Sequence, residues 1–340
     1  MKKVRLGIIG AGSIVQLQHL PFLRSYEDVE VIAIADTDRL KAGAVADKFG
    51  VKHSYRVADD LVARSDIDAV IITSPNSTHL PMALAAFAAK KHVLVERPIA
   101  RNYSEAKRMV EAAEAAGCRL MVAMNHRFRP DSLILQNLIS QEELGPVYHI
   151  ETGWLKKLGD AARPDWIFNP RISGGGVMMD LGIQLLDLTW WIIGMPKVKG
   201  VIAKLYHHTL KTKVEDYASV GVTAEGCSIN LEAAWDIPSK HTIAYTVVHG
   251  EIGIAWLNPL RIHRLMHGDI MELTPGKQYT RMELYHKSYE NEIKHFVESL
   301  LSGRQPISSG IESLQVMRTL EMVYRSAKEN RFVSAEEISD

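Results

Sequence analysis

One candidate for chemistry is the stretch HVLVERPIA, at residues 92–100. Its apolar run stops at three residues of different kinds, Glu96, Arg97 and Pro98. Proline fixes the local backbone, which suits a loop that must hold its side chains in place. The guanidinium of Arg97 can polarise a carbonyl during a reduction, or hold a carboxylate through two parallel hydrogen bonds. It cannot act as a base, because it stays protonated in proteins.

A second candidate is SGGGVMMDLGIQLLDLTWWIIG, at residues 173–194. Three glycines precede a segment that is apolar nearly all round, which predicts a buried helix near 177–193. The exceptions are Asp180, Gln184 and Asp187, whose spacing puts them on one face of that helix. Acids in such surroundings usually have a partner or a function. For Asp187 we favour a structural hydrogen-bond network, and for Asp180 a functional role.

The N-terminal segment carries a pattern for binding a dinucleotide. Its first apolar run ends in the turn Gly10-Ala-Gly12-Ser13-Ile14. A glycine turn between a strand and a helix lets the backbone approach a pyrophosphate and points amide groups at it. The third glycine of the usual fingerprint is Val15 here, so the helix and the strand must pack together in a different way.

An acid follows this turn at the expected distance. Asp36 ends the second apolar run, about 20 residues beyond the turn, where a carboxylate holds the ribose 2′-hydroxyl of NAD. Its charge would repel the 2′-phosphate of NADP. The sequence therefore predicts NAD as the cofactor and NADP as the less favoured alternative, which the nearby Arg39 keeps open.

Another loop rich in polar residues follows the third apolar run. It is SPNSTH at 74–79, with Ser74, Pro75, Asn76 and His79. In open parallel sheets ligands bind beyond the carboxyl ends of the strands, so we expect this loop and the Glu-Arg-Pro loop to line the cofactor crevice. The alternative is that Asn76 is a turn residue and His79 starts a helix.

The elements that must position these residues fall into two groups. Over residues 1–125, short aliphatic runs alternate with helical patterns, which predicts a doubly wound α/β domain with a parallel sheet. Over residues 126–340, apolar and polar residues alternate in short segments, which predicts a mostly antiparallel sheet. The predicted strands are 4–10, 29–36, 68–74, 92–96, 119–125, 147–155, 198–208, 217–225, 228–235, 242–250 and 253–257. The predicted helices are 39–50, 79–91, 103–117, 130–143, 177–193 and 311–329.

Composition narrows the function classes. Lys plus Arg and Asp plus Glu number 40 each, so no overall charge favours nucleic acid, a membrane surface or an acidic partner. Two cysteines without a CxxC spacing suggest neither a disulfide framework nor a metal clip. No apolar run has the length of a membrane span, and no repeated histidine spacing indicates a metal site. We expect a cytoplasmic protein that binds a small molecule.

Taken in order along the chain, these motifs resemble the glucose–fructose oxidoreductase, inositol dehydrogenase and MocA (Gfo/Idh/MocA) family. The resemblance implies an N-terminal Rossmann domain and a C-terminal α+β domain with a large open sheet. It also implies homodimers or homotetramers packed through that sheet, and substrates that are sugars, polyols or their derivatives. The matching stretches are GIIGAGSI, ITSPNSTH, KHVLVERP, NHRF, GGGVMMDLGIQLLDLTWWIIG, VEDYASV and YENEIKHFVESLLSGRQP.

The resemblance also implies roles for single residues. Substrate contacts fall on Arg97, Arg127, Asp180 and Gln184. The cofactor set is Gly10, Gly12, Ser13, Ile14, Asp36, Ser74, Pro75, Asn76, His79, Glu96, Arg97 and Asn125.

Two positions depart from the family pattern. The lysine of the Glu-Lys-Pro signature is Arg97, and the histidine of the helix motif is Gln184. Oxidation of an alcohol needs a base near the hydroxyl, and neither replacement can serve as one. Asp180 is the titratable residue left in the matched set, and His126 is a second candidate.

Three hypotheses follow. The first is an NAD-dependent oxidoreductase acting on a sugar, polyol or sugar acid. The second is a dinucleotide-binding protein that has lost turnover and acts as a sensor or assembly partner. The third keeps NAD bound and uses transient oxidation to enable elimination or hydrolysis. We favour the first, because dehydrogenase sites vary while keeping hydride chemistry.

Overall fold

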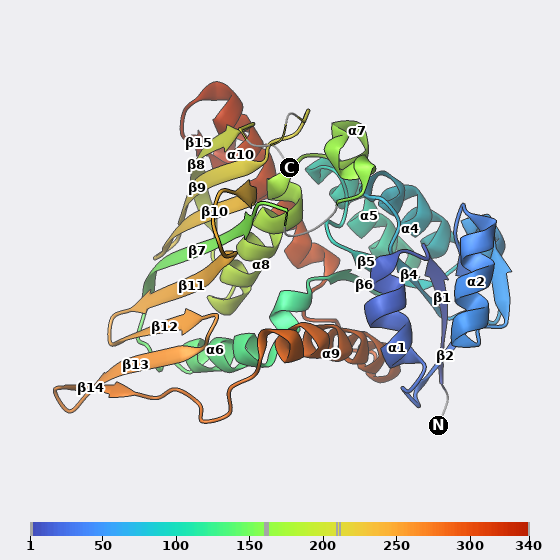
Figure 1. Cartoon of the computed structure of the whole chain (residues 1–340), viewed down its shortest axis with the longest axis horizontal. Helices are drawn as coiled ribbons and strands as arrows, with labels where there is room; N and C mark the ends of the chain where they lie inside the picture. Colours follow the sequence, from blue (N-terminus) through green and yellow to red (C-terminus); the bar gives the residue numbers. More distant parts are fainter. Residues whose placement is uncertain (1–2, 160–162, 209, 211, 339–340) are drawn as a thin grey trace. The chain divides into compact units, whose positions relative to one another are not determined.

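The computed structural model describes residues 3–159, 163–208, 210 and 212–338. The chain divides into two compact units (Figure 1). Unit 1 comprises Met1–Asn125 and His286–Leu314, and unit 2 comprises His126–Tyr285 and Gln315–Asp340. Residues 286–314, which the sequence assigns to the second domain, thus lie in the first unit.

Unit 1 is built on a sheet of six parallel strands. Every residue of β4 and β6 is buried, so both faces of the sheet are covered, as continuous aliphatic runs require. The strands are β1 Val4–Ile9, β2 Val29–Ala35, β3 His53–Tyr55, β4 Ala69–Ile72, β5 His92–Glu96 and β6 Leu120–Ala123. The helices are α1 Leu20–Leu23, α2 Arg39–Phe49, α3 Ala58–Val62, α4 His79–Ala88 and α5 Tyr103–Ala116.

The strand order β3-β2-β1-β4-β5-β6 has its reversal point between β1 and β4. This is the order of a dinucleotide-binding sheet, in which ligands bind beyond the carboxyl ends of the strands near that point. The predicted doubly wound fold of the first half is therefore confirmed.

A late segment of the chain completes unit 1. Helix α9 (Arg281–Ser302) is followed by a stretch that pairs with the last strand of the parallel sheet. Val122 donates its backbone N–H to Ser308 O at 2.9 Å, and Ser308 Oγ donates back to Val122 O at 2.7 Å. Met121 and Ser309 form an antiparallel bridge. These contacts cover the edge of β6, which would otherwise be unpaired.

Unit 2 is built on a sheet of nine strands, with α8 (Ile183–Ile192) along one face (Figure 1). Only the β7–β10 pair is parallel, and the other seven pairs are antiparallel, so the predicted mostly antiparallel sheet is confirmed. Its strands are β7 Val147–Lys157, β8 Val198–Tyr206, β9 Tyr217–Ala224, β10 Ser228–Ile237, β11 Ile243–Gly250, β12 Gly253–Leu257, β13 Arg261–Met266, β14 Asp269–Glu272 and β15 Val333–Ser334. The other helices are α6 Pro130–Ser140, α7 Pro170–Ser173 and α10 Gly310–Glu329, of which residues 315–329 belong to this unit.

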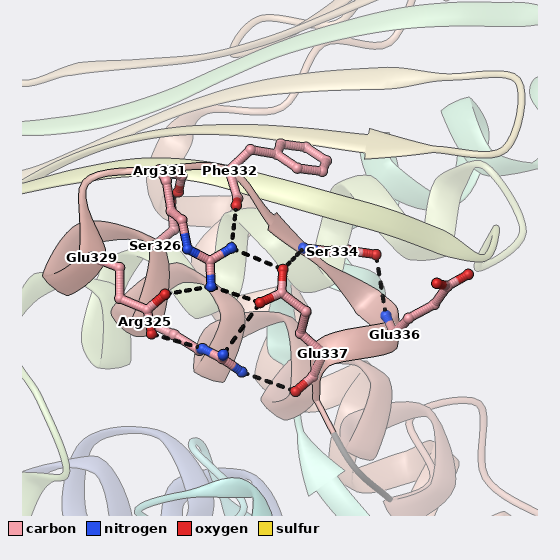
Figure 2. Close-up of polar contacts among 8 residues, drawn as sticks. All are labelled: Arg325, Ser326, Glu329, Arg331, Phe332, Ser334, Glu336 and Glu337. Atoms are coloured by element: carbon pink, nitrogen blue, oxygen red, sulfur yellow. Dashed lines mark hydrogen bonds and ion pairs between the residues drawn. The ribbon is translucent and has the colours of Figure 1, made fainter.

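A network of ion pairs connects α10 to the segment that follows it, up to Glu337 (Figure 2). Arg331 Nη2 lies 2.6 Å from Glu337 Oε2, and Arg325 Nη2 lies 3.2 Å from the same oxygen. Glu329 accepts from both arginines. The network ties the terminal segment to α10, so that β15 can pair with the edge strand β8.

The described ranges contain no helix with both the length and the hydropathy of a membrane span. Over the same ranges, no group of three histidine, cysteine or acidic side chains is arranged to hold a metal ion.

Candidate active site

The glycine turn and the acid that the sequence pairs with it lie together in unit 1. Gly10 has a φ of +103°, and a Cβ there would lie 2.7 Å from the hydroxyl of Thr73, so this position requires glycine. The backbone N–H of Ala11 donates to Asp36 Oδ2 at 2.8 Å. The acid at the end of β2 therefore fixes the turn at the end of β1.

The turn also fits a dinucleotide on its open side. A Cβ placed on Gly12 would meet no atom within 4 Å, and Ser13 is exposed. The space in front of the backbone is thus open where a pyrophosphate would approach the amide groups. Gly12, Ser13 and Ile14 would hold that group, and Asp36 the ribose.

Val15 is accommodated by a local change in the helix. It is fully buried and begins η1 (Val15–His19), a π-helical turn that precedes α1. A π-turn is wider than an α-turn, and such turns are frequent at functional sites. The wider turn thus begins at the position where the usual fingerprint has glycine.

The loop after β4 is tied to the loop after β5 by a buried histidine. His79 Nε2 lies 2.8 Å from Ser74 O, and His79 Nδ1 lies 2.9 Å from Pro98 O. Burial lowers the pKa of His79, and the two carbonyl oxygens oppose that shift. In this geometry His79 joins the two loops. Asn76 is buried in the short 3-10 helix Asn76–Thr78 that follows Pro75.

Glu96, at the end of β5, has a partner that the sequence did not indicate. Its Oε1 lies 3.1 Å from Nε2 of His19, the last residue of η1. Burial alone would raise the pKa of Glu96, but the hydrogen bond and charge of His19, with Arg97 nearby, outweigh it and lower that pKa. The first helix is thereby connected to the Glu-Arg-Pro loop.

The two remaining residues predicted for this unit also follow strands. Arg97 comes directly after β5, and Asn125 comes shortly after β6. Asn125 is buried, and its Nδ2 donates to Ser288 Oγ of α9 at 2.9 Å. The structure thus places the predicted cofactor residues of unit 1 at the carboxyl ends of four strands, β1, β2, β4 and β5, and just beyond β6.

Unit 2 carries Asp180 on a second π-turn. This turn, η5 (Met178–Gly182), leads directly into α8. Trp235, fully buried in β10, donates its indole N–H to Asp180 Oδ2 at 2.8 Å. Gln184 Nε2 donates to the backbone carbonyl of Asp180 at 2.8 Å. The carboxylate is therefore oriented by a neutral donor, while the glutamine supports the backbone beneath it.

The glycine-rich segment before η5 is held by a buried acid. Glu215 Oε1 accepts from the backbone N–H groups of Gly176 and Met178, at 2.9 and 3.2 Å, and from Tyr324 Oη at 2.9 Å. A Cβ on Gly176 would collide with the backbone of Glu215. Burial raises the pKa of Glu215, against the effect of these hydrogen bonds, and burial also raises the pKa of Tyr324. These contacts fix the start of the turn that carries Asp180.

The other candidate base, His126, is stacked on an aromatic side chain. Its ring lies 5.2 Å from that of Trp154, at an angle of 26° between the ring planes. Trp154 belongs to β7, next to β10, which carries Trp235. Both candidate bases thus lie against tryptophans of neighbouring strands.

Arg127 has a different environment from the one that a substrate contact implies. Its guanidinium forms two hydrogen bonds with Asp187, at 2.8 and 2.6 Å, and both side chains are buried. Asp187 is thus part of a structural ion pair, as its position on an apolar helix predicts. We assign the same structural role to Arg127.

Sequence reasoning did not point to three residues that support this site: His19, Glu215 and Trp235. For Glu215 a signal existed, because it lies in the stretch VEDYASV, which is one of the motifs that resemble the family. The indole of Trp235 meets Asp180 across 55 positions of the sequence, and no local pattern encodes that contact.

Comparisons with known proteins agree with this geometry. Residues 4–124 match the model of the Gfo/Idh/MocA oxidoreductase family with an NAD-binding Rossmann fold. Residues 133–255 match a Gfo/Idh/MocA C-terminal domain model. The two matches follow one another along the chain and together cover more than half of it.

Relatives and solved structures agree along almost the whole chain. The chain is 28% identical to a D-xylose 1-dehydrogenase (NADP+) of Haloferax volcanii, covering 95% of this chain and 97% of the relative. It is 27% identical to an inositol 2-dehydrogenase of Rhizobium meliloti, covering 97% and 99%. The fold matches that of a levoglucosan dehydrogenase in complex with NADH and levoglucosan, with a TM-score of 0.88, 21% identity, and coverage of 98% and 100%. The chain belongs to the Gfo/Idh/MocA family of oxidoreductases.

Proposed function

We propose that this chain is an NAD(P)-dependent dehydrogenase that interconverts a secondary alcohol and a ketone on a sugar, polyol or sugar acid. The observation that carries the proposal is the hydrogen bond from the Trp235 indole to Asp180. It holds a carboxylate in a fixed orientation, in a chain that also has the complete set of strand-end loops for a dinucleotide.

Oxidation of the alcohol needs one acceptor for a hydride and another for a proton. A nicotinamide, when bound, accepts the hydride that leaves the alcohol carbon. The hydroxyl proton must leave at the same time, to a base. We assign that proton to Asp180 in the oxidation, and its return from Asp180 in the reduction. The neutral indole donor stabilises the carboxylate without supplying a competing proton.

The two departures from the family pattern receive different roles. Gln184 does not titrate, and its amide donates to the carbonyl of Asp180, so we assign it to support of the turn. Arg97 has five N–H donors in a planar fork, which suits a carboxylate or a polarised carbonyl oxygen. We propose that it binds the substrate, which favours sugar acids among the possible substrates.

We also propose that the subunits associate through the large sheet of unit 2. Ile202, Tyr206 and Ile243 lie on the face that points away from α8, and each is at least 38% exposed. Exposed apolar side chains on two strands of this face, β8 and β11, would suit such an interface. A homodimer or homotetramer formed in this way would be seen by light scattering.

The test is steady-state NADH production with a panel of aldoses, inositols and sugar acids. Asp180→Asn keeps the shape of the side chain and should lower kcat by about 10²- to 10⁴-fold, the range for loss of a general base. His126→Gln is the matched variant, and we expect it to retain most of the activity.

The outcomes separate the functions that the sequence left open. Loss of activity in His126→Gln with retention in Asp180→Asn would move the base to His126. NAD that co-purifies and turns over without net reduction would favour a lyase or hydrolase. NAD binding without turnover on any substrate would favour a sensor.

A further inference from the structure

The carboxylate of Asp36 has a cationic partner. Lys41 Nζ lies 2.8 Å from Asp36 Oδ2. The same carboxylate accepts the backbone N–H groups of Ala11 and Asp38, at 2.8 and 2.9 Å. Burial would raise the pKa of Asp36, but the hydrogen bond from Lys41 and the two N–H groups outweigh it and lower that pKa. The carboxylate of Asp36 is therefore ionised at neutral pH.

This pairing changes how the site treats a 2′-phosphate. An acid at the end of the second strand favours NAD because its negative charge repels the extra phosphate of NADP. Here an ammonium group adjoins that charge, so the pair has no net charge and the repulsion is weakened. A carboxylate that is paired with an ammonium group discriminates only weakly against NADP.

Lys41 occupies an unusual place for a cation. It is the third residue of α2, in the first helical turn. This turn is the positive end of the helix dipole, which disfavours positive side chains. Asp38 caps this helix by accepting the N–H groups of Leu40 and Lys41. The side chain of Lys41 is 41% exposed and that of Asp36 is 9% exposed. The ammonium therefore has a solvent side from which an anion can reach it.

We propose that Lys41 is a specificity-determining residue of the dinucleotide site, whose ammonium moves from Asp36 to a 2′-phosphate and lets the chain bind NADP as well as NAD. The proposal rests on the proposed function, because it takes the β2 end to be the ribose site. A lysine on a flexible four-carbon stem can make this exchange, and Asp36 keeps its two backbone donors when the lysine leaves. With NAD, the ion pair stays closed.

The experiment measures dissociation constants for NAD and NADP by isothermal titration calorimetry. Lys41→Met removes the charge and leaves Asp36 unneutralised. We expect its NADP affinity to fall about ten- to hundredfold, as for loss of a charge-assisted hydrogen bond, and its NAD affinity to change by less than about threefold. Lys41→Arg, which keeps the charge, should retain NADP binding.

Two controls separate Lys41 from its surroundings. Lys48→Met removes a cation from the last turn of the same helix, where Lys48 lies over the ring of Phe49, and should change neither affinity. Arg39→Gln tests the other cation of the first turn. Salt should weaken NADP binding more steeply in the native protein than in Lys41→Met. Unchanged thermal unfolding of each variant shows that the fold is kept.

The inference is overturned if the native protein binds NAD but not NADP, or if Lys41→Met leaves the ratio of the two dissociation constants unchanged. It is equally overturned if Arg39→Gln, and not Lys41→Met, removes NADP binding. Failure of the proposed function has a different signature, since it is seen as absent NADH production while the dissociation constants are still measured.

Discussion

The guanidinium of Arg127 and the carboxylate of Asp187 form a two-pronged ion pair inside unit 2, with N–O distances of 2.8 and 2.6 Å. The side chains are 0% and 1% exposed. Taking both charges out of water costs free energy, and the attraction between the two charges compensates that cost. It links the short helix after β6 to α8, which continues from the turn that carries Asp180.

Asp187→Asn should lower the free energy of unfolding by about 3–5 kcal/mol, because it leaves the Arg127 charge buried without its counter-ion. Urea unfolding followed by circular dichroism measures the loss. Glu298→Gln is the control, since it removes an exposed ion pair with Lys294 and should cost less than about 0.5 kcal/mol. Equal effects of the two changes would show that burial does not decide the strength of these pairs.

Gly12→Ala should separate binding from folding. The new methyl group enters open space, so the free energy of unfolding should change by less than about 1 kcal/mol. The affinity for NAD should fall at least about tenfold, because the methyl group lies where the backbone must approach a pyrophosphate. Gly10→Ala should instead destabilise the fold by about 1–3 kcal/mol, because its φ of +103° strains any other residue. Calorimetry with NAD and thermal unfolding distinguish the two, and normal NAD binding by Gly12→Ala would contradict the placement of the pyrophosphate.

Glu215 should make stability fall as pH rises. Its folded-state pKa is raised above the ordinary value of 4.5, so between these two values the native state binds more protons than the unfolded state. Glu215→Gln still accepts the three hydrogen bonds and should remove this pH dependence. Glu215→Ala should cost about 1–3 kcal/mol at any pH, because it leaves buried donors unpaired. Urea unfolding from pH 4.5 to 8 gives both results, and parallel curves for the native protein and Glu215→Gln would refute the argument.

Trp235→Phe should impair catalysis more than binding. It removes the indole donor to Asp180, and a hydrogen bond to a charged group is typically strong enough for a drop in kcat of about tenfold or more. KM should change less, because the indole N–H is already donated to Asp180. Trp190→Phe is a matched control, since its indole donates at 2.9 Å to the carbonyl of Pro196 and not to Asp180. A similar fall in kcat for both variants would point to a packing defect.

The sequence was most informative where a pattern and its physical cause are both local. The five aliphatic runs of the first half became strands because a parallel sheet buries both faces, and the glycine turn and Asp36 meet because successive strands end at one edge. Strands β13 and β14 were missed: β14 is the edge strand of its sheet and is exposed throughout, so it lacks apolar alternation, and β13 is the strand next to it. Contacts such as His19 with Glu96 were also missed, because they join residues that come together only when the sheet forms.

The return of the chain to unit 1 has a consequence for biosynthesis. The first unit contains an early segment, residues 1–125, and a late one, residues 286–314. Ser308 and Ser309 of the late segment complete the edge of β6. A ribosome-bound chain that has emerged only through Asn125 exposes the unpaired amides of that strand until some 180 further residues, from 126 to 309, have followed. At about 5–20 residues per second, this interval lasts on the order of ten seconds or longer. The nascent protein therefore exposes this unpaired strand edge throughout that interval, during which chaperones would protect the first unit.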